Sequence, residues 1–314
     1  MVVRILLIAT IVLGIILRLY HLDSKIYWHD EVYTIFRAGG FTREEIDGQL
    51  FSNRFVSVIE LQQFLQPKPG STSFDTIQSL AREDPQHPPL YFLLTRYWMQ
   101  WFGNSVFFLR LLPALISILS LPAIYYLAFA LTQGNSLVSL MAASLLALSP
   151  VDILFAQTVR QYSALTLATI LSAFLLTKAW QTDRRAYWLL FALSVAFGFY
   201  IHPFFALSVI AFGLFILLTQ IRKLASFVLA CILGLSIYTP WIIVMGSNLA
   251  RVFAITNWAT MAVSPLYRLQ LWLLSFTCMF FDLDAGFDHP LTYLLRVPFL
   301  FIILLAVIFV CQRA

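Results

Sequence analysis

The sequence predicts an all-α membrane protein, a polytopic bundle of transmembrane helices with a helical first loop outside the membrane. Apolar residues make up 61% and charged residues 11% of the 314 residues, whereas a soluble domain carries about 45–50% apolar and about 25% charged residues. The mean hydropathy is +0.84, and long apolar stretches recur along the chain. These values exclude a soluble enzyme, a disordered chain and a disulfide-rich scaffold.

A helix crosses the hydrocarbon core of a bilayer with about 20 mostly apolar residues. We expect eight crossings, at residues 2–20, 105–131, 136–149, 162–180, 186–201, 203–219, 224–245 and 291–311. The first stretch resembles a signal peptide, but no small-x-small cleavage motif follows it, so we interpret it as an uncleaved anchor. Stretch 136–149 is short unless it extends towards Phe155. We expect one membrane domain over residues 1–314, either a short protein or a C-terminally truncated one, because the sequence stops directly after an apolar stretch.

Loop charges predict which connections share a side of the membrane. Segments 182–185 and 220–223 each carry clustered basic residues, and short loops rich in Lys and Arg stay in the cytoplasm. The turn at His202 then lies on the opposite side, together with loops 150–160 and 21–104. We therefore expect residues 21–104 to form an extracytoplasmic loop with interfacial helices.

This count requires that residues 88–102 do not cross the membrane. The segment has only 15 residues and contains Arg96 and Gln100, which predicts an interfacial helix. For residues 264–281 it is likewise open whether the segment crosses the membrane. Arg18, near the end of the first apolar stretch, is placed where a long cationic side chain can reach the interface.

The charge balance argues against a nucleic-acid partner. The net charge is +5, but the basic residues are scattered and form no stripe of the kind that binds phosphate backbones. Ten of the fifteen acidic residues lie within 21–87, so the first loop is where acidic chemistry is expected. The three cysteines lie in apolar stretches without ligand-type spacing, which predicts buried small hydrophobes.

An acidic pair, Asp30 and Glu31, follows the first helix. It lies within the aromatic stretch 27–33, and Trp and Tyr prefer the membrane interface, so the pair is expected at headgroup level. Two interpretations stay open: a solvated pair capping a short helix at 31–38, or a carboxylate with a tuned pKa that acts as a general base or binds a divalent ion. Neighbouring helical residues point about 100° apart, so we expect Asp30 to be catalytic and Glu31 to support it.

Further candidates lie before the second membrane segment and at a later turn. Glu83, Asp84 and His87 precede Pro88-Pro89, which start a helix. These three residues either belong to an ordinary turn that ends the loop, or they are groups at the membrane surface that line a cavity. His202 is a structural hydrogen-bonding group or another lining residue. Residues 43–63 predict a mixed helix along the surface.

Arg160 opens an apolar helix on the outer side, where a positive charge is unfavourable to the helix dipole. Something must offset this charge. One interpretation is an interfacial arginine that touches lipid headgroups. The other is a phosphate-binding group formed by Arg160 with Gln157 and Tyr162.

These pieces together resemble the polytopic GT-C glycosyltransferases. Within this group the chain resembles bacterial proteins similar to dolichyl-phosphate-mannose protein mannosyltransferase and to the lipid A aminoarabinose transferase. The resemblance covers roughly residues 15–245 and rests on residues 18–20, 28–31, 84–91, 102–103, 109–115 and 149–163. The chain departs from it at Gln157-Thr-Val-Arg160, where many members carry Glu-Ala-Arg.

The resemblance implies a GT-C-like fold and an inverting transfer of a sugar from a polyprenyl-phosphate donor. The acceptor is a hydroxyl or amine of a lipid, glycan or protein. Asp30 matches the family's catalytic acid. Glu83 and Asp84 match cavity-lining or metal-binding groups. The leaving phosphate is expected to bind Arg160, with Arg251 and Arg268 as further candidates.

Two other function classes stay open: a flippase or transporter of polyprenyl-linked glycans, and a polymerase of surface glycans. A transporter keeps ionisable residues near the bilayer midplane, whereas here the charges cluster at the outer face, which favours a transferase. The expected location is the bacterial inner membrane with the site facing outward. No His/Cys metal spacing exists, and the sequence identifies no definite cofactor, but a divalent ion at Asp30 and Asp84 stays an open alternative.

Overall fold

The computed structural model describes residues 1–257, 262–281, 296–298 and 300–305, and within them the chain is helical without any strand. This confirms the predicted class, an all-α polytopic membrane protein. The main helices are α1 (Val2–Leu19), α2 (His29–Gly39), α3 (Arg43–Leu50), α4 (Val58–Gln62), η1 (Gln63–Leu65), α5 (Ser73–Glu83), α6 (Leu90–Phe102), α7 (Val106–Leu131), α8 (Ser136–Ala147), α9 (Pro150–Ala156), α10 (Tyr162–Thr182), α11 (Arg185–Ile201), α12 (Phe205–Thr219), η2 (Ile221–Lys223), α13 (Leu224–Ser247), α14 (Leu249–Thr256) and α15 (Pro265–Cys278).

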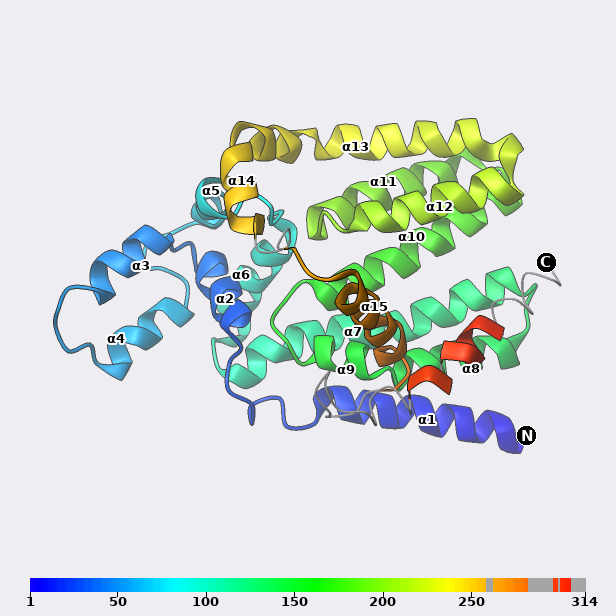
Figure 1. Cartoon of the computed structure of the whole chain (residues 1–314), viewed down its shortest axis with the longest axis horizontal. Helices are drawn as coiled ribbons and strands as arrows, with labels where there is room; N and C mark the ends of the chain where they lie inside the picture. Colours follow the sequence, from blue (N-terminus) through cyan, green and yellow to red (C-terminus); the bar gives the residue numbers. More distant parts are fainter. Residues whose placement is uncertain (258–261, 282–295, 299, 306–314) are drawn as a thin grey trace.

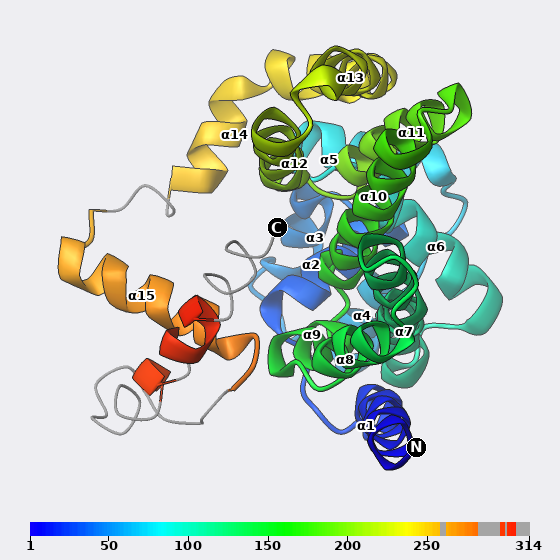
Figure 2. The ribbon, with the colours of Figure 1, turned by 90° about the vertical axis from the view of Figure 1, so that its right-hand side faces the viewer.

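The long helices lie side by side along one direction, and the short helices α2 to α5 gather at one end of them (Figure 1). Seen nearly end-on, α1, α8, α7, α10, α11 and α13 follow one another as a row, with α14 and α15 to one side (Figure 2). Each helix in the row packs against the next. Small residues such as Ala192 and Ala230 sit in the core between α10, α11 and α13, where they let apolar helices approach closely.

The membrane-spanning segments agree with much of the expectation. Within the described residues, α1, α7, α10 and α13 with η2 are long and apolar enough to cross a membrane. The short stretch at 136–149 does extend past Phe155, as α8 and α9, which are bent by 62° and count as a fifth span if they are one. Helices α11 and α12 are apolar but shorter. The eighth expected crossing, 291–311, falls largely outside the described residues.

The connections segregate between the two ends of the bundle as the loop charges predict. Lys223 Nζ lies 2.6 Å from Asp183 Oδ2, so the two basic loops lie together. At the other end, the rings of His87 and His202 are 6.2 Å apart, so the first loop meets the turn between α11 and α12. The N-terminus lies at the end opposite α2 to α5 (Figure 1). We call the end that holds α2 to α5 the loop end.

The first loop is helical, with two differences from the prediction. Helix α2 begins two residues before the expected 31–38 and ends at Gly39. It is capped by Gly40, whose φ of +88° is the left-handed conformation that favours glycine. The single helix expected over 43–63 is wrong: α3 ends at Leu50, and α4 begins only at Val58. Each of these helices has its own capping box, so the chain restarts a helix rather than continuing one.

Arg18 does not reach the interface, which corrects the expectation for it. Its guanidinium is fully buried and lies 2.6 Å from Asp152 Oδ2. It also donates to Ser117 Oγ and to the carbonyl oxygens of Gly14 and Ala147. A buried arginine is retained when it is paired and hydrogen-bonded, and Asp152 supplies that partner from α9. This pair ties the end of α1 to the bend between α8 and α9.

Candidate functional site

The acidic pair at the start of α2 splits between two environments. Glu31 is buried and forms a two-pronged pair with Arg110, Oε1 to Nε at 2.9 Å and Oε2 to Nη2 at 2.8 Å. It also accepts the backbone N–H groups of Val159 and Trp28, both at 2.9 Å. All its acceptor capacity is therefore used inside the protein. As expected from the helix geometry, Asp30 points elsewhere, and Glu31 holds three chain segments together behind it.

Asp30 keeps partial access to solvent, with 31% of its side chain exposed. Its Oδ2 lies 3.3 Å from Nη2 of Arg160, and its Oδ1 lies 3.3 Å from Nδ1 of His29. One helical turn later, Thr34 Oγ donates to the Asp30 backbone carbonyl at 2.9 Å. The carboxylate of Asp30 is thus held beside a cation while one face stays open. This is a geometry that suits a general base, because the carboxylate is held in place by its neighbours and can still be reached from outside.

Arg160 lies in the non-helical segment between α9 and α10, and its side chain is nearly buried. Nη1 donates to Thr34 Oγ at 3.2 Å, and Nη2 faces Asp30. Nε is buried and has no hydrogen-bond partner. The charge that was expected to need an offset at the start of α10 is offset by Asp30. The unused Nε–H leaves this guanidinium able to take a further anionic acceptor.

The two residues grouped with Arg160 in the sequence differ in placement. The amide of Gln157 donates to the backbone carbonyls of Leu17 and Tyr20, and its oxygen accepts from Lys25. Gln157 therefore holds the end of α1, and its polar atoms face that end rather than Arg160. The ring of Tyr162 lies beneath Arg160, with its centroid 5.9 Å from the guanidinium carbon.

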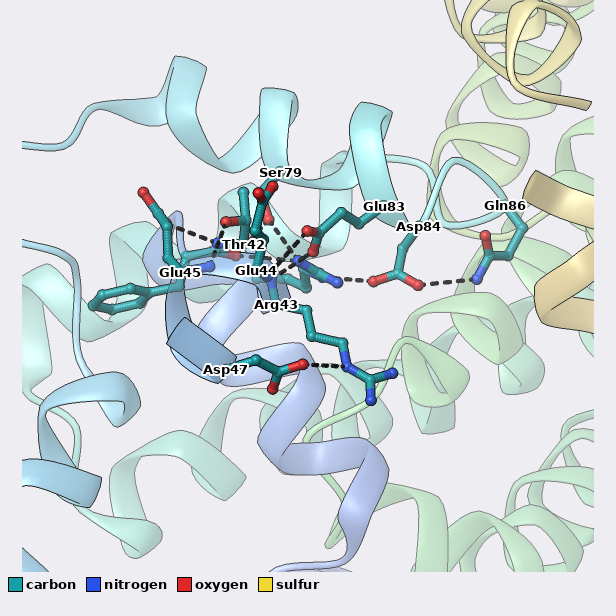
Figure 3. A network of polar contacts seen from close by, with 11 residues as sticks. Thr42, Arg43, Glu44, Glu45, Asp47, Ser79, Glu83, Asp84 and Gln86 are labelled. Atoms are coloured by element: carbon teal, nitrogen blue, oxygen red, sulfur yellow. Dashed lines mark hydrogen bonds and ion pairs between the residues drawn. The ribbon is translucent and has the colours of Figure 1, made fainter. Parts of the chain in front are cut away.

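Glu83 and Asp84 are bound by a second arginine. Arg37 donates from Nη1 to Glu83 and from Nε to Asp84 at 2.5 Å. Glu83 also accepts the backbone N–H groups of Arg43 and Glu44, at the start of α3 (Figure 3). Burial acts to raise the pKa of Glu83, but the Arg43 N–H and the Arg37 charge outweigh it and hold that pKa below its usual value. These carboxylates join α2, α3 and α5.

Asp84 is not free to serve as a metal ligand beside Asp30. It pairs with Arg37 and accepts from the amide of Gln86 (Figure 3), while Asp30 pairs with Arg160. Within the described residues, no group of three or more His, Cys, Asp or Glu side chains is placed to hold a metal ion.

Two histidines meet near Arg160. The ring of His202 lies 6.2 Å from that of His87 and 6.5 Å from that of Tyr162. His87 Nδ1 is 3.1 Å from the side-chain nitrogen of Gln161. Burial, followed by the charge of Arg160, lowers the pKa of His202 to about 4 and that of His87 well below its usual value. Both imidazoles are therefore neutral at physiological pH.

The structure thus brings together Asp30, Arg160, His87, His202 and Tyr162. It does not bring in Arg251 or Arg268, which lie exposed on α14 and α15. We find no contact between either of these side chains and Asp30 or Arg160 in the part of the chain that is described.

Sequence reasoning missed four residues that shape this site: Thr34, Arg37, Arg110 and Gln161. Arg37 and Arg110 lie in stretches whose sequence predicts a helix but indicates no special role for the arginine. An unpaired arginine in an apolar stretch is costly, so Arg110, within the membrane helix α7, was the one with a usable signal. Nothing local marks Thr34 or Gln161, because their roles depend on segments far away in the sequence.

One of the comparisons with known proteins places the chain in a family. The family model described as dolichyl-phosphate-mannose-protein mannosyltransferase matches residues 86–244, just over half of the chain. The match includes His87, Arg160 and His202, while Asp30 precedes it. The searches among curated proteins and among solved structures found no match. The chain belongs to the dolichyl-phosphate-mannose-protein mannosyltransferase family, and it is a membrane-embedded glycosyltransferase of the GT-C type.

Proposed function

We propose that this protein transfers a sugar, with inversion, from a polyprenyl-phosphate donor to a hydroxyl or amine of a lipid, glycan or protein acceptor. The family membership implies a lipid-linked donor and an acceptor at a membrane. One observation supports the rest of the proposal: the partly exposed carboxylate of Asp30 lies 3.3 Å from the nearly buried guanidinium of Arg160, at the loop end of the bundle. A transfer of this kind needs a base for the acceptor and a cation for the phosphate.

The roles follow from the charges. Asp30 takes the proton of the acceptor group while the acceptor oxygen or nitrogen attacks the anomeric carbon. The bond between that carbon and the phosphate oxygen breaks, and its electron pair leaves with polyprenyl phosphate. Arg160 binds the departing phosphate, because its Nε–H is unused and a guanidinium matches phosphate oxygens in geometry and charge. Asp30 thus holds the proton released by the acceptor, and Arg160 stabilises the negative charge on the departing phosphate.

The location in the cell follows from loop charge. The two basic loops, 182–185 between α10 and α11 and 220–223 between α12 and α13, lie at the end of the bundle opposite the loop end (Figure 1). Short basic loops stay in the cytoplasm, so the site faces outward, at the outer face of the bacterial inner membrane. A donor with a long isoprenoid tail reaches such a site from within the bilayer. The apolar faces that α1, α7 and α13 expose provide the lipid-facing surface along which it travels.

The test is transfer by the purified protein in nanodiscs, with undecaprenyl phosphomannose as the donor and membrane extract as the acceptor. Asp30→Asn removes the base, and a positioned base contributes about 10²–10⁴ in rate, so transfer is expected to fall by that factor while the thermal transition is retained. The matched control is Asp23→Asn, an exposed acid of the same connection, which should transfer at the wild-type rate. Wild-type transfer by Asp30→Asn excludes the mechanism.

A second readout separates a transferase from a flippase. Cells that lack the gene should lose one sugar modification of a cell-envelope product and keep a normal distribution of lipid-linked precursors. A precursor that accumulates on the cytoplasmic face instead assigns the protein to translocation.

A further inference from the structure

The end of the bundle opposite the loop end carries a positively charged surface (Figure 1). It is formed by the two basic loops, which hold Arg184, Arg185, Arg222 and Lys223. Between residues 153 and 281 the sequence contains one acidic residue, Asp183, and Lys223 Nζ lies 2.6 Å from its Oδ2. The acid of this region is therefore already paired with a cation, and we call the three remaining arginines the basic surface.

The three arginines of the basic surface are close together and exposed. Arg184 directly follows Asp183, and Arg222 directly precedes Lys223, so the ion pair between the two loops brings the arginines near one another. All three are exposed, and no carboxylate of the described residues pairs with them. The basic surface thus holds positive charge that an anionic partner would neutralise.

Tryptophan side chains flank the basic surface on the helices that lead into the loops. Trp180 lies near the end of α10, and the centroid of its ring is 4.9 Å from that of Phe215 on α12. Trp188 lies in the first turn of α11, and its indole nitrogen donates to Asp183 Oδ1 at 3.5 Å. Because tryptophan is enriched at the interface between membrane and water, the basic surface is expected at the depth of the lipid headgroups.

Exposed apolar side chains continue directly from the basic surface. Leu218 and Ile221, which precede Arg222, are 81% and 57% exposed. Leu189, one helical turn after Arg185, is 54% exposed. Cations beside exposed apolar groups match the two parts of a phospholipid, its anionic head and its acyl chains. A dissolved anion would satisfy the cations alone, so this arrangement favours a lipid.

We infer that the basic surface binds the headgroup phosphates of anionic phospholipids, whose acyl chains lie along the exposed apolar residues of α11 and α12. A guanidinium matches phosphate oxygens in geometry and charge. A zwitterionic headgroup has the same phosphate but also carries a cation, which the basic surface repels. The protein therefore selects anionic over zwitterionic phospholipids. The basic surface and Asp30 lie at opposite ends of the bundle, so this inference does not rest on the proposed function.

The experiment measures the lipid preference directly. Purified protein in a mild detergent is titrated with phosphatidylglycerol or with phosphatidylcholine of the same acyl chains, and native mass spectrometry gives the dissociation constant of the first bound lipid. The ratio of the two constants reports the selectivity for the anionic headgroup. We expect the wild type to prefer phosphatidylglycerol, and this preference should weaken as the salt concentration rises, because salt screens exposed charges.

The test variant combines Arg184→Gln, Arg185→Gln and Arg222→Gln. A basic residue near an anionic lipid surface contributes about fivefold in affinity, so each substitution alone should lower the ratio about fivefold, and the triple variant should lose the preference. Lysine at the same three positions keeps the charge and should keep most of the preference. The matched control is Arg54→Gln, an exposed arginine between α3 and α4, which should bind both lipids as the wild type does.

Three outcomes overturn the inference. The first is a wild-type preference in the triple glutamine variant, whose melting temperature should match the wild type because no ion pair is removed. The second is equal affinity of the wild type for both lipids. The third is displacement of phosphatidylglycerol by inorganic phosphate at constant ionic strength, which would identify a site for a dissolved anion. These measurements involve no sugar transfer, so Asp30→Asn should show the wild-type lipid preference whatever the fate of the proposed function.

Discussion

Oδ2 of Asp30 lies 3.3 Å from Nη2 of Arg160, and this pair links the first turn of α2 to the segment that precedes α10. The two residues are the proposed base and the proposed phosphate-binding group. In the absence of substrate, each side chain therefore neutralises the charge of the other. The donor phosphate and Asp30 compete for the same guanidinium, so donor binding is expected to free the carboxylate for the acceptor proton.

This competition predicts that Asp30→Asn binds undecaprenyl phosphate more tightly than the wild type, although its sugar transfer is much slower. A partly exposed ion pair contributes about 0.2–1 kcal/mol, so the gain should be up to about fivefold, measured by microscale thermophoresis in nanodiscs. Arg160→Gln should instead weaken binding about tenfold or more, because it removes a charge-assisted hydrogen bond. Equal or weaker binding by Asp30→Asn would argue against competition.

The pair between Glu31 and Arg110 predicts a large effect on stability. Both side chains are buried, and Arg110 also donates to the backbone carbonyls of Leu22, Lys25 and Ile26. Removing one partner of a buried pair leaves an uncompensated charge and costs about 3–5 kcal/mol. Glu31→Gln should therefore lower the melting temperature in detergent markedly.

The control for this prediction is Asp47→Asn, which breaks the exposed pair between Arg43 and Asp47. An exposed pair of this spacing contributes about 0.3–0.5 kcal/mol, so the melting temperature should barely change. Equal melting temperatures for Glu31→Gln and Asp47→Asn would contradict the structural role of Glu31.

His202 predicts a loss of stability in weak acid. Burial first, and then the charge of Arg160, lowers the pKa of His202 from 6.5 to about 4. Between these values the unfolded chain binds a proton that the folded protein does not, so stability is fully present above pH 6.5 and declines as the pH falls towards 4. The decline approaches about 1.4 kcal/mol per pH unit for one group. Melting temperatures recorded from pH 7.5 to 4 measure it.

His202→Asn is the variant that tests this assignment. Asn retains an acceptor for the Phe204 N–H, which His202 Nδ1 now binds at 3.0 Å, but it does not titrate. The melting curve should therefore become flatter between pH 6.5 and 4, and the remaining slope includes the contribution of His87. The exposed His21 serves as the control, since His21→Asn should reproduce the wild-type profile. A wild-type slope in His202→Asn would locate the titration elsewhere.

Gly14 predicts how closely α1 must pack on α8. A Cβ atom at this position would lie 2.4 Å from the carbonyl oxygen of Ala147 and 2.7 Å from its Cβ, a clash with backbone that cannot move aside. Gly14→Val should cost about 1–3 kcal/mol, as overpacking does, and it should also displace Arg18, which donates to both of these backbones. The thermal transition in detergent measures the loss.

Ala9→Val is the comparison for Gly14, because Ala9 is exposed on the same helix and its substitution adds the same kind of side chain to a lipid-facing position. Its melting temperature should stay at the wild-type value. A stable Gly14→Val would show that α1 is free to move away from α8.

The segments that were predicted well are those whose signal is local. Apolar length alone identified α1, α7, α10 and α13, since each stretch is long enough by itself to span a bilayer. The angle of about 100° between neighbouring helical residues was enough to separate Asp30 from Glu31. The break between α3 and α4 was missed, because residues 51–57 interrupt a pattern that is otherwise typical of one helix.

The side chains whose placement was missed have partners far away in the chain. Arg18 meets Asp152, 134 residues later, and the Gln157 amide meets Leu17, 140 residues earlier. In both cases local position suggested the membrane surface or a phosphate, and a distant segment supplied a stronger partner. A charged group in an apolar setting takes the partner that removes it from lipid, wherever in the chain that partner lies.

Residue order alone established a membrane-embedded helical protein, the common side of its basic loops, and Asp30 as the candidate base, because hydropathy, loop charge and helical angle act over a few residues. Only the tertiary structure determined which arginine pairs with which acidic residue. Arg110 takes Glu31, Arg37 takes Glu83 and Asp84, and Arg160 takes Asp30. The first two pairings are mostly buried and reinforced by further hydrogen bonds, whereas the third keeps an open face and an unused N–H. That difference arises from packing between distant segments, and it separates a structural ion pair from a site.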